Sequence, residues 1–357
     1  YNFRFDLGLA LKKNGYEVIF VSPYSLYSEK IKEVFAYVDV ELSAKGKNPF
    51  KELQTIYNFY KIYRKITPDI ILHYTIKPNI YGTFAASALG IPTINNIAGL
   101  GTLFINQNFV TKIAKWLYKF SQKRATKVFF QNNDDFNIFV TEKLVEKDKC
   151  DVLPGSGVDI KRFVPVDKEN DDFFRFLIVS RMLWTKGIGE YVDAAEIIKN
   201  KYKNIEFQLL GFLDVQSPMA ISKVQMDIWE SSGIINYLGT SDDVRIEISK
   251  ADCMVLPSYY REGTPRTLLE SASMGKPIIT TDNVGCRDVV DNGINGYLCK
   301  VRNAEDLADK MEMVLKLSDN ERTLMGKKGR EKVVKEFDEK IVINKYLKNI
   351  KEILLSP

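Results

Sequence analysis

Residues 174–200 read FRFLIVSRMLWTKGIGEYVDAAEIIKN, and this stretch decides the fold class. Its first seven residues are rich in large apolar side chains, which is typical of a strand buried on both faces of a parallel sheet. A short loop follows, and apolar residues then recur at helical spacing over 188–200. A strand that leads directly into a helix is the repeating unit of α/β proteins.

The same alternation extends in both directions along the chain. Repeated strand–helix units imply parallel sheets covered by helices on both faces. The other predicted strands are 17–22, 69–72, 93–96, 127–131, 150–153, 206–210, 255–257 and 277–280, and the other predicted helices are 1–13, 50–66, 111–124 and 265–274. Because an α/β domain ordinarily opens with a strand, we expect a further strand and its loop before residue 1.

The 357 residues exceed what one compact core usually serves, so we expect two domains. Residues 152–167, VLPGSGVDIKRFVPVD, combine glycine, proline and charge between the two series of strands, which is typical of a boundary. The predicted fold is therefore α/β, with two Rossmann-like domains facing across a cleft. The predicted N-terminal domain is 1–155, the C-terminal domain is 156–335, and a last helix at 336–357 crosses back to the first domain.

Composition excludes several classes of protein. The apolar fraction of 45% and the charged fraction of 27% are ordinary globular values, and a net charge of +5 is too small for a protein that is basic throughout. We therefore expect no nucleic-acid partner. The single histidine excludes a histidine-rich metal site, and the four cysteines show no metal-binding or disulfide pattern. No apolar run reaches the ~18–20 residues that span a bilayer.

Loops at the carboxyl ends of the second domain's strands carry the candidate chemistry. Arg181 and Lys186 lie just before a predicted helix, where two cations and the helix dipole suit a diphosphate. The alternative is that both are solvated surface charges. The next strand ends at Gly211, where a glycine permits close approach of the backbone to a ligand.

The third strand end runs into YREGTPRTLLE, residues 260–270. Thr264 is positioned to cap a helix and Pro265 to begin it. Glu262 then lies just outside the helix and Glu270 inside it. Carboxylates suit sugar and ribose hydroxyls because they accept two hydrogen bonds in one plane. The alternative is a helix with two solvated acids. The fourth strand ends in TTDNVGCRD, residues 280–288, where Gly285 precedes another helix start. Agreement among the four strand ends favours a nucleotide-diphosphate site.

These residues resemble the retaining GT-B glycosyltransferases that carry an E-x7-E motif, the family 4 type. The segments RMLWTKG, VLPGSGVD and SMGKPIITTDNVGC also match that family, so the resemblance covers most of the chain. It implies a nucleotide-sugar donor, a catalytic Glu262 and no metal or other cofactor. The residues that it implies for donor binding are Arg181, Lys186, Gly211, Leu238, Gly263, Thr264, Leu269 and Glu270.

In the first half, LHYTIKPNIYG (72–82) and NNIAGLGTLF (95–104) resemble a subgroup that builds bacterial surface saccharides on undecaprenyl diphosphate, including N-acetylgalactosaminyltransferases. The resemblance implies transfer of a sugar, with an N-acetylhexosamine as one candidate, from a UDP-sugar to a polyprenyl-diphosphate-linked saccharide. His73 is predicted to have a catalytic role in the cleft; the alternative is a structural histidine. The predicted acceptor-binding residues are Lys77, Asn79, Gly99, Gly101 and Thr102.

Residues 111–127 contain six basic residues and no acidic one. On a helix, Lys112, Lys115, Lys119 and Lys123 form one stripe beside an apolar face of Ile113, Leu117 and Phe120. This pattern suits a helix lying on anionic lipid. Together with the lipid-linked acceptor that the resemblance implies, it predicts a cytoplasmic protein peripheral to the inner face of the plasma membrane. The alternative is an ordinary surface helix. Transfer to a soluble acceptor and a non-catalytic carbohydrate-binding protein of the same fold are the alternative functions.

Overall fold

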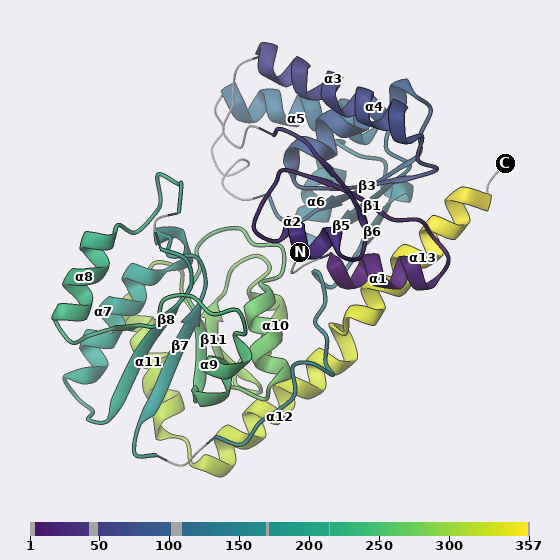
Figure 1. Cartoon of the computed structure of the whole chain (residues 1–357). Coiled ribbons are helices and arrows are strands. Elements are labelled where there is room, and N and C mark those ends of the chain that lie inside the picture. Colours follow the sequence, from purple (N-terminus) through teal and green to yellow (C-terminus); the bar gives the residue numbers. More distant parts are fainter. Residues whose placement is uncertain (1–3, 43–48, 101–108, 169–170, 214, 356–357) are drawn as a thin grey trace. The chain divides into compact units, whose positions relative to one another are not determined.

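A computed structural model of the chain describes residues 4–42, 49–100, 109–168, 171–213 and 215–355. These residues form two compact units, which Figure 1 shows coloured along the chain. Unit 1 comprises residues 1–156 and 340–357, and unit 2 comprises residues 157–339. The last helix, α13 (Glu339–Leu355), thus lies almost wholly in unit 1, far from the rest of that unit in sequence.

Unit 2 is built on a parallel sheet of six strands in the order β12-β11-β10-β7-β8-β9. The strands are β7 (Phe174–Val179), β8 (Ile205–Leu210), β9 (Asn236–Tyr237), β10 (Cys253–Leu256), β11 (Ile278–Thr281) and β12 (Gly296–Cys299). The helices are α7 (Ile188–Lys199), α8 (Lys223–Ser231), α9 (Arg245–Lys250), α10 (Arg266–Ser273), α11 (Ala304–Lys316) and α12 (Asp319–Glu336), with short turns η3 (Trp184–Lys186) and η4 (Arg287–Val289).

Two apolar cores cover the two faces of this sheet. On one face, alternate strand residues such as Phe176 and Ile178 pack against α7 and α11. On the other face, the intervening residues such as Leu177 and Val179 pack against α9, α10 and α12. Figure 1 shows α9 and α10 on the near side of the strands and α11 behind them. Residues next to each other in a strand therefore serve opposite layers, as the period of two in a strand requires.

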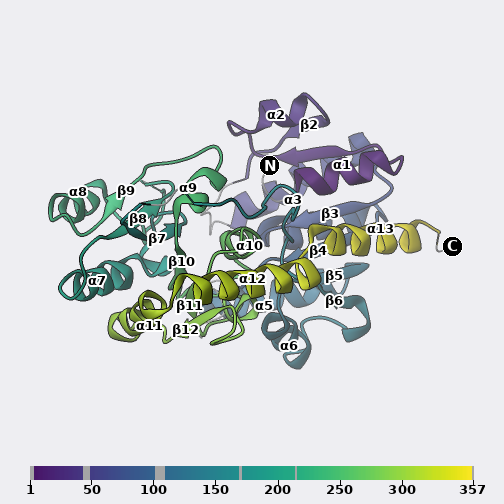
Figure 2. The same cartoon turned by 90° about the horizontal axis from the view of Figure 1, so that it is seen from below.

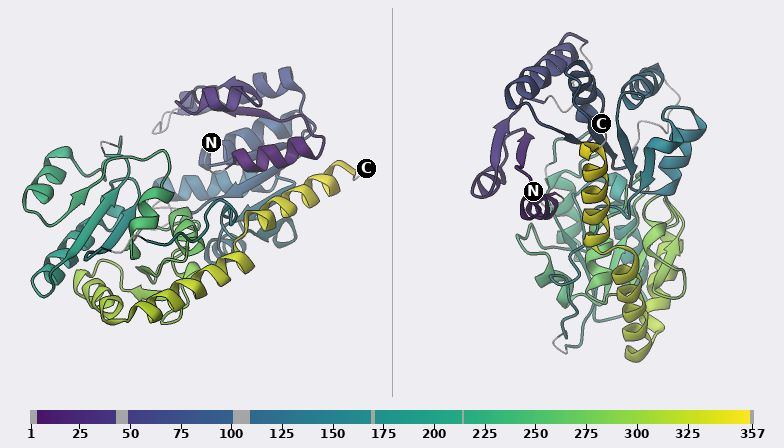
Figure 3. Two further views of the ribbon diagram at one scale, coloured as in Figure 1. Left: turned by 60° about the horizontal axis from the view of Figure 1, so that its bottom comes forward. Right: turned by 90° about the vertical axis from the view of Figure 1, so that its right-hand side faces the viewer.

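Unit 1 contains a parallel four-stranded sheet in the order β3-β4-β5-β6 and a separate parallel pair β1-β2, which Figure 3 shows in purple. The strands are β1 (Ile19–Ser22), β2 (Ala36–Asp39), β3 (Ile71–Tyr74), β4 (Thr93–Ile97), β5 (Lys127–Phe130) and β6 (Cys150–Val152). The helices are α1 (Phe5–Lys13), α2 (Ser28–Lys32), α3 (Pro49–Ile66), α4 (Thr83–Ala88), α5 (Phe109–Gln122) and α6 (Asn133–Thr141), with a π-helical turn η1 (Pro78–Gly82) and a 3₁₀ turn η2 (Lys147–Lys149).

Helix α13 completes the core of unit 1 together with α1. Leu7 and Leu11 of α1 and Tyr346 of α13 pack against the same buried residues of β4 and β5, and Figure 2 shows the two helices close together. The Asn96 amide at the end of β4 donates a hydrogen bond of 2.9 Å to the Tyr346 hydroxyl. The expected strand before residue 1 stays a prediction.

Candidate active site

The start of helix α10 brings the two glutamates of the predicted motif into one structure. Helix α10 begins at Arg266, one residue later than predicted, and Pro265 occupies the position before it. The prediction that Thr264 occupies the cap position was therefore wrong, because Pro265 occupies it. Thr264 and Gly263 lie buried in the loop that leads into the helix. The loop itself is fixed by contacts with neighbouring strand ends.

Glu262 is held by two side chains. The Lys186 ammonium lies 2.5 Å from Glu262 Oε1, and both side chains are largely buried, with 14% and 13% of their surface exposed. The buried Ser258 hydroxyl donates a hydrogen bond of 2.9 Å to the same carboxylate oxygen. Lys186 belongs to the loop after β7, whereas Ser258 and Glu262 belong to the loop after β10. The carboxylate therefore joins two adjacent strand ends.

The loop after β11 supports the loop that carries Glu262. The Thr281 hydroxyl donates to the Ser258 carbonyl oxygen at 2.5 Å, and the Asn283 amide donates to the Tyr260 carbonyl oxygen at 3.0 Å. Gly285 has a positive φ of 77°, and a Cβ there would lie 1.9 Å from the Gly263 carbonyl oxygen. Only glycine therefore allows this close approach.

Glu270 lies inside helix α10 and is nearly buried, with 8% of its surface exposed. Its Oε1 accepts a hydrogen bond of 2.9 Å from Arg266 Nε, one turn earlier in the helix. Burial raises the pKa of the Glu270 carboxyl, and the charge and hydrogen bond of Arg266 oppose that shift. Glu270 is thus not a solvated surface acid but a buried carboxylate that the helix pairs with a guanidinium.

The other predicted donor residues differ in what they offer a ligand. Arg181 is exposed after β7, and Leu238 is half-buried after β9. Gly211 has a positive φ of 143°, and a Cβ there would lie 1.8 Å from the Ser180 carbonyl oxygen, so packing against β7 already explains the glycine. The Leu269 side chain is wholly buried and packs in the core, so its side chain has a packing role, and its predicted contact with the donor stays a prediction.

His73 in unit 1 is buried on β3 and both of its ring nitrogens are engaged. Nε2 lies 2.9 Å from the Tyr63 hydroxyl, and Nδ1 lies 2.9 Å from Asn95 Oδ1. Gly82 makes room for this pair, because a Cβ there would lie 2.5 Å from His73 Nε2. Burial lowers the pKa of His73 to about 4. Burial and these two partners favour the alternative, a structural histidine, over the predicted catalytic role.

The predicted acceptor residues also serve the interior of unit 1. The Lys77 ammonium forms an ion pair of 2.7 Å with Glu52 of α3. Asn79 is buried in η1, and its amide nitrogen donates to the Asn96 carbonyl oxygen at 2.8 Å, whereas its Oδ1 has no partner among the described residues. Its predicted contact with an acceptor stays a prediction. Gly99 follows β4 with a positive φ of 106°. Gly101 and Thr102 lie outside the described residues.

Comparison with known families decides the class of protein. The sequence profile of the family described as "Glycosyl transferases group 1" matches residues 159–332, and that of "Glycosyl transferase 4-like" matches residues 3–132. The chain is also 30% identical to the N,N'-diacetylbacillosaminyl-diphospho-undecaprenol α-1,3-N-acetylgalactosaminyltransferase of Campylobacter jejuni, over 98% of this chain and 94% of that enzyme. The chain belongs to the glycosyltransferases.

Two further likenesses agree with this assignment. The UDP-Gal:α-D-GlcNAc-diphosphoundecaprenol α-1,3-galactosyltransferase of Escherichia coli is 25% identical over 94% of this chain and 86% of that enzyme. The crystal structure of a glycosyltransferase from Rickettsia africae superimposes with a TM-score of 0.81 at 21% identity, covering 100% of this chain and 95% of that one. The predicted fold class, GT-B with two Rossmann-like domains, is confirmed.

Sequence reasoning missed part of the candidate site. Ser258 and Asn283 follow strands as ordinary loop residues, and no spacing pattern reveals that they hold the Glu262 loop. No group of three or more histidine, cysteine, aspartate or glutamate side chains suited to a metal ion occurs among the described residues. In the same part of the chain, no helix is long and apolar enough to cross a bilayer.

Proposed function

We propose that this glycosyltransferase moves a sugar from a UDP-sugar to a polyprenyl-diphosphate-linked saccharide during assembly of a bacterial surface glycan, with retention of the anomeric configuration. The observation that supports donor binding is the Lys186–Glu262 pair beside the start of α10. There the Lys186 ammonium is suited to a diphosphate, and the Glu262 carboxylate is suited to the hydroxyls of a hexose. The acceptor side is supported by the Campylobacter relative, whose name specifies an undecaprenyl-diphosphate-linked substrate.

Each donor residue has a distinct role in this proposal. Lys186 and exposed Arg181 neutralise the diphosphate, and the backbone at Gly263 and Thr264 approaches it closely. Glu262 accepts hydrogen bonds from hydroxyls of the hexose, and Glu270 accepts them from the ribose. Gly211 and the peptide at Leu238 approach the uracil side of the nucleotide. A donor phosphate oxygen takes the acceptor's proton on the front face of the sugar, so the protein supplies no nucleophile.

The acceptor requires access to a membrane, and helix α5 is suited to it. Ala114, Tyr118 and Ser121 bury one face of α5 in unit 1. The opposite face exposes Ile113, Trp116 and Phe120 by 44%, 58% and 39%, with exposed Lys112, Lys119 and Lys123 beside them. Apolar side chains flanked by lysines favour binding to an anionic lipid surface. We therefore propose a peripheral protein on the cytoplasmic face of the plasma membrane.

Calorimetry with UDP and a transfer assay test the donor site together. The assay uses radiolabelled UDP-sugars, including UDP-N-acetylhexosamines, and short-chain polyprenyl-diphosphate saccharides. Lys186→Ala should weaken UDP binding by about tenfold or more, because it removes a cation from the diphosphate. Glu262→Gln should abolish transfer while UDP binds as well as before or better, because Lys186 no longer pairs with a carboxylate.

Matched control variants distinguish a specific effect on the donor site from a general loss of folding or activity. Lys223→Ala on α8 and Glu196→Gln on α7 change exposed residues of the same types and should leave UDP affinity and transfer unaltered. Failure of the wild-type chain to bind UDP would remove the proposal and leave a non-catalytic protein of the same fold. Transfer to free saccharides at the same rate as to lipid-linked ones would instead replace the proposed acceptor with a soluble one.

A further inference from the structure

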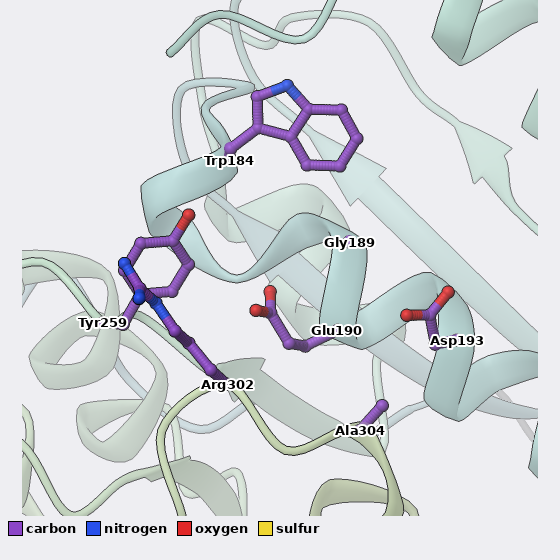
Figure 4. A pocket seen from close by; sticks show the side chains of 7 residues that line it. All are labelled: Trp184, Gly189, Glu190, Asp193, Tyr259, Arg302 and Ala304. Atoms are coloured by element: carbon purple, nitrogen blue, oxygen red, sulfur yellow. The ribbon is translucent and has the colours of Figure 1, made fainter.

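Unit 2 has a polar pocket with a volume of about 300 Å³, and its lining does not include Lys186, Glu262 or Glu270. Figure 4 shows the side chains of Trp184, Glu190, Asp193, Tyr259 and Arg302 around it, beside the start of α11. These residues follow the carboxyl ends of β7, β10 and β12, the edge at which parallel sheets bind ligands. Some of the lining residues belong to α7 and α11, which cover one face of the sheet. Helix α10, which carries Glu270, covers the other face.

The pocket and the donor site share two segments of chain. In the turn after β7, Trp184 lines the pocket, whereas Lys186 pairs with Glu262. In the loop after β10, Tyr259 lines the pocket, whereas Ser258 holds Glu262. The backbone N–H of Tyr259 donates a hydrogen bond of 3.1 Å to the Thr185 carbonyl oxygen and so joins the two segments. The two sites therefore share the turn after β7 and the loop after β10, but use different side chains of these segments.

The charged groups of the pocket are not neutralised within the described residues. Arg302 stacks its guanidinium over the Tyr259 ring, 4.3 Å from the centroid, and does not form an ion pair with Glu190 or Asp193 there. Burial raises the pKa of Glu190, the Asp193 charge raises it further, and Arg302 opposes the shift. Two carboxylates and one guanidinium give the lining a net negative charge, which disfavours a phosphate or another anion.

We propose that this pocket binds a pyranose ring of a saccharide, independently of the nucleotide-sugar site. The half-buried faces of Trp184 and Tyr259 can pack against the C–H face of such a ring. The Glu190 and Asp193 carboxylates accept hydrogen bonds from its hydroxyls, and Arg302 donates to its oxygens. A concave site with aromatic walls and a few converging polar groups is the usual form of a small-molecule site, and its volume suits one or two sugar rings.

Fluorine NMR on protein labelled with 5-fluorotryptophan tests the proposal directly. The chain has three tryptophans, so three signals are expected, and Trp184→Phe identifies the one from the pocket. Methyl glycosides of N-acetylgalactosamine, galactose and glucose are titrated to about 50 mM, the range in which single sugars usually bind. At least one glycoside should shift the Trp184 signal saturably, with the Trp116 signal unchanged. Absence of any shift by all three overturns the proposal.

Variants and a second probe distinguish a sugar site from a site for a cation or from a general solvent effect. Glu190→Gln should weaken glycoside binding by about tenfold, because it removes a charged acceptor. Glu196→Gln, on the same helix but outside the pocket, should leave it unchanged. A shift that is equal in wild type and Glu190→Gln, or one produced by methylammonium but by no glycoside, overturns the proposal. UDP calorimetry on the Glu190→Gln protein should give the wild-type affinity. This measurement distinguishes an error in the proposed sugar pocket from an error in the proposed UDP site.

Discussion

At the scale of the residue, the position of Glu262 depends on a serine that touches no substrate in the proposed reaction. Ser258 is wholly buried, and its hydroxyl donates to Glu262 while the same oxygen lies 3.2 Å from the Thr185 carbonyl. It therefore fixes one carboxylate oxygen between the loops after β7 and β10. A carboxylate that must meet a hexose hydroxyl gains from this fixed orientation, since small displacements reduce rates strongly.

Ser258→Ala should lower kcat by about tenfold, because a hydrogen bond to a charged group contributes roughly 1.5 kcal/mol or more. UDP affinity and the KM for the donor should change little, because Lys186 remains. The readout is the separation of kcat from KM, with UDP calorimetry on the same protein. Ser271→Ala is the control, because Ser271 is equally buried and its hydroxyl has no partner among the described residues. Equal losses in both variants would contradict a positioning role.

At the scale of the element, the sequence predicted the strands and helices whose patterns are strong. Strand 174–180 and helix 188–200 differ from β7 and α7 by one residue at the end. Strands β2, β9 and β12 were missed. β9 has two residues, and β2 has two half-buried residues between exposed ends, so neither carries a buried apolar run. β12 was missed because the glycines before it indicated a turn. Its pairing with β11 depends on contacts between residues that are distant in sequence, which a local pattern cannot predict.

The same limit applies to side chains. The sequence placed His73 and Asn79 near a strand end, which was correct. The decisive fact is that residues of other elements occupy both ring nitrogens of His73 and the amide nitrogen of Asn79; these residues are Tyr63, Asn95 and Asn96. On α5 the period located the exposed lysines but not the buried face, because Ala114 and Ser121 are small or polar and still pack inward. The positions of Arg181, Gly211 and Leu238 were easier to predict, because these residues follow strands β7, β8 and β9 closely; their contact with a donor stays a prediction.

Helix α5 offers a test at this scale. Changing Lys112, Lys119 and Lys123 to Glu should weaken binding to vesicles rich in anionic lipid by about 100-fold or more, since each lysine contributes on the order of 1 kcal/mol at such a surface. Lys115 is left intact because it pairs with Glu142 at 2.7 Å and contributes to the fold. Cosedimentation with anionic and with neutral vesicles measures the effect.

The control changes three exposed lysines of unit 2, Lys223, Lys327 and Lys335, to Glu. It alters the net charge of the chain by the same amount without touching α5. Equal weakening by the two sets of changes would show that net charge alone attracts the protein to lipid. No weakening by the α5 set would remove the helix from the proposed membrane surface.

At the scale of the whole molecule, each unit has its own apolar cores, and the only histidine lies inside unit 1. His73 is neutral in a network in which Tyr63 and Asn95 occupy both ring nitrogens, and its pKa is lowered from 6.5 to about 4 by burial. Between these values the unfolded chain binds a proton that the native chain does not. Stability from this source is therefore complete above pH 6.5 and falls as the pH drops towards 4.

The resulting loss should total about 3 kcal/mol and should fall on unit 1 alone. Hydrogen exchange of the amides in β4 and in β8, corrected for intrinsic rates at pH 7.5 and 5, measures the opening free energy of each unit. Wild-type β4 should lose about 2 kcal/mol over that interval through His73, and His73→Gln should lose correspondingly less. The change in β8 should be the same in both proteins. Since the histidine is single, its NMR titration gives the pKa without assignment, and a native value near 6.5 would contradict the structural role given to it.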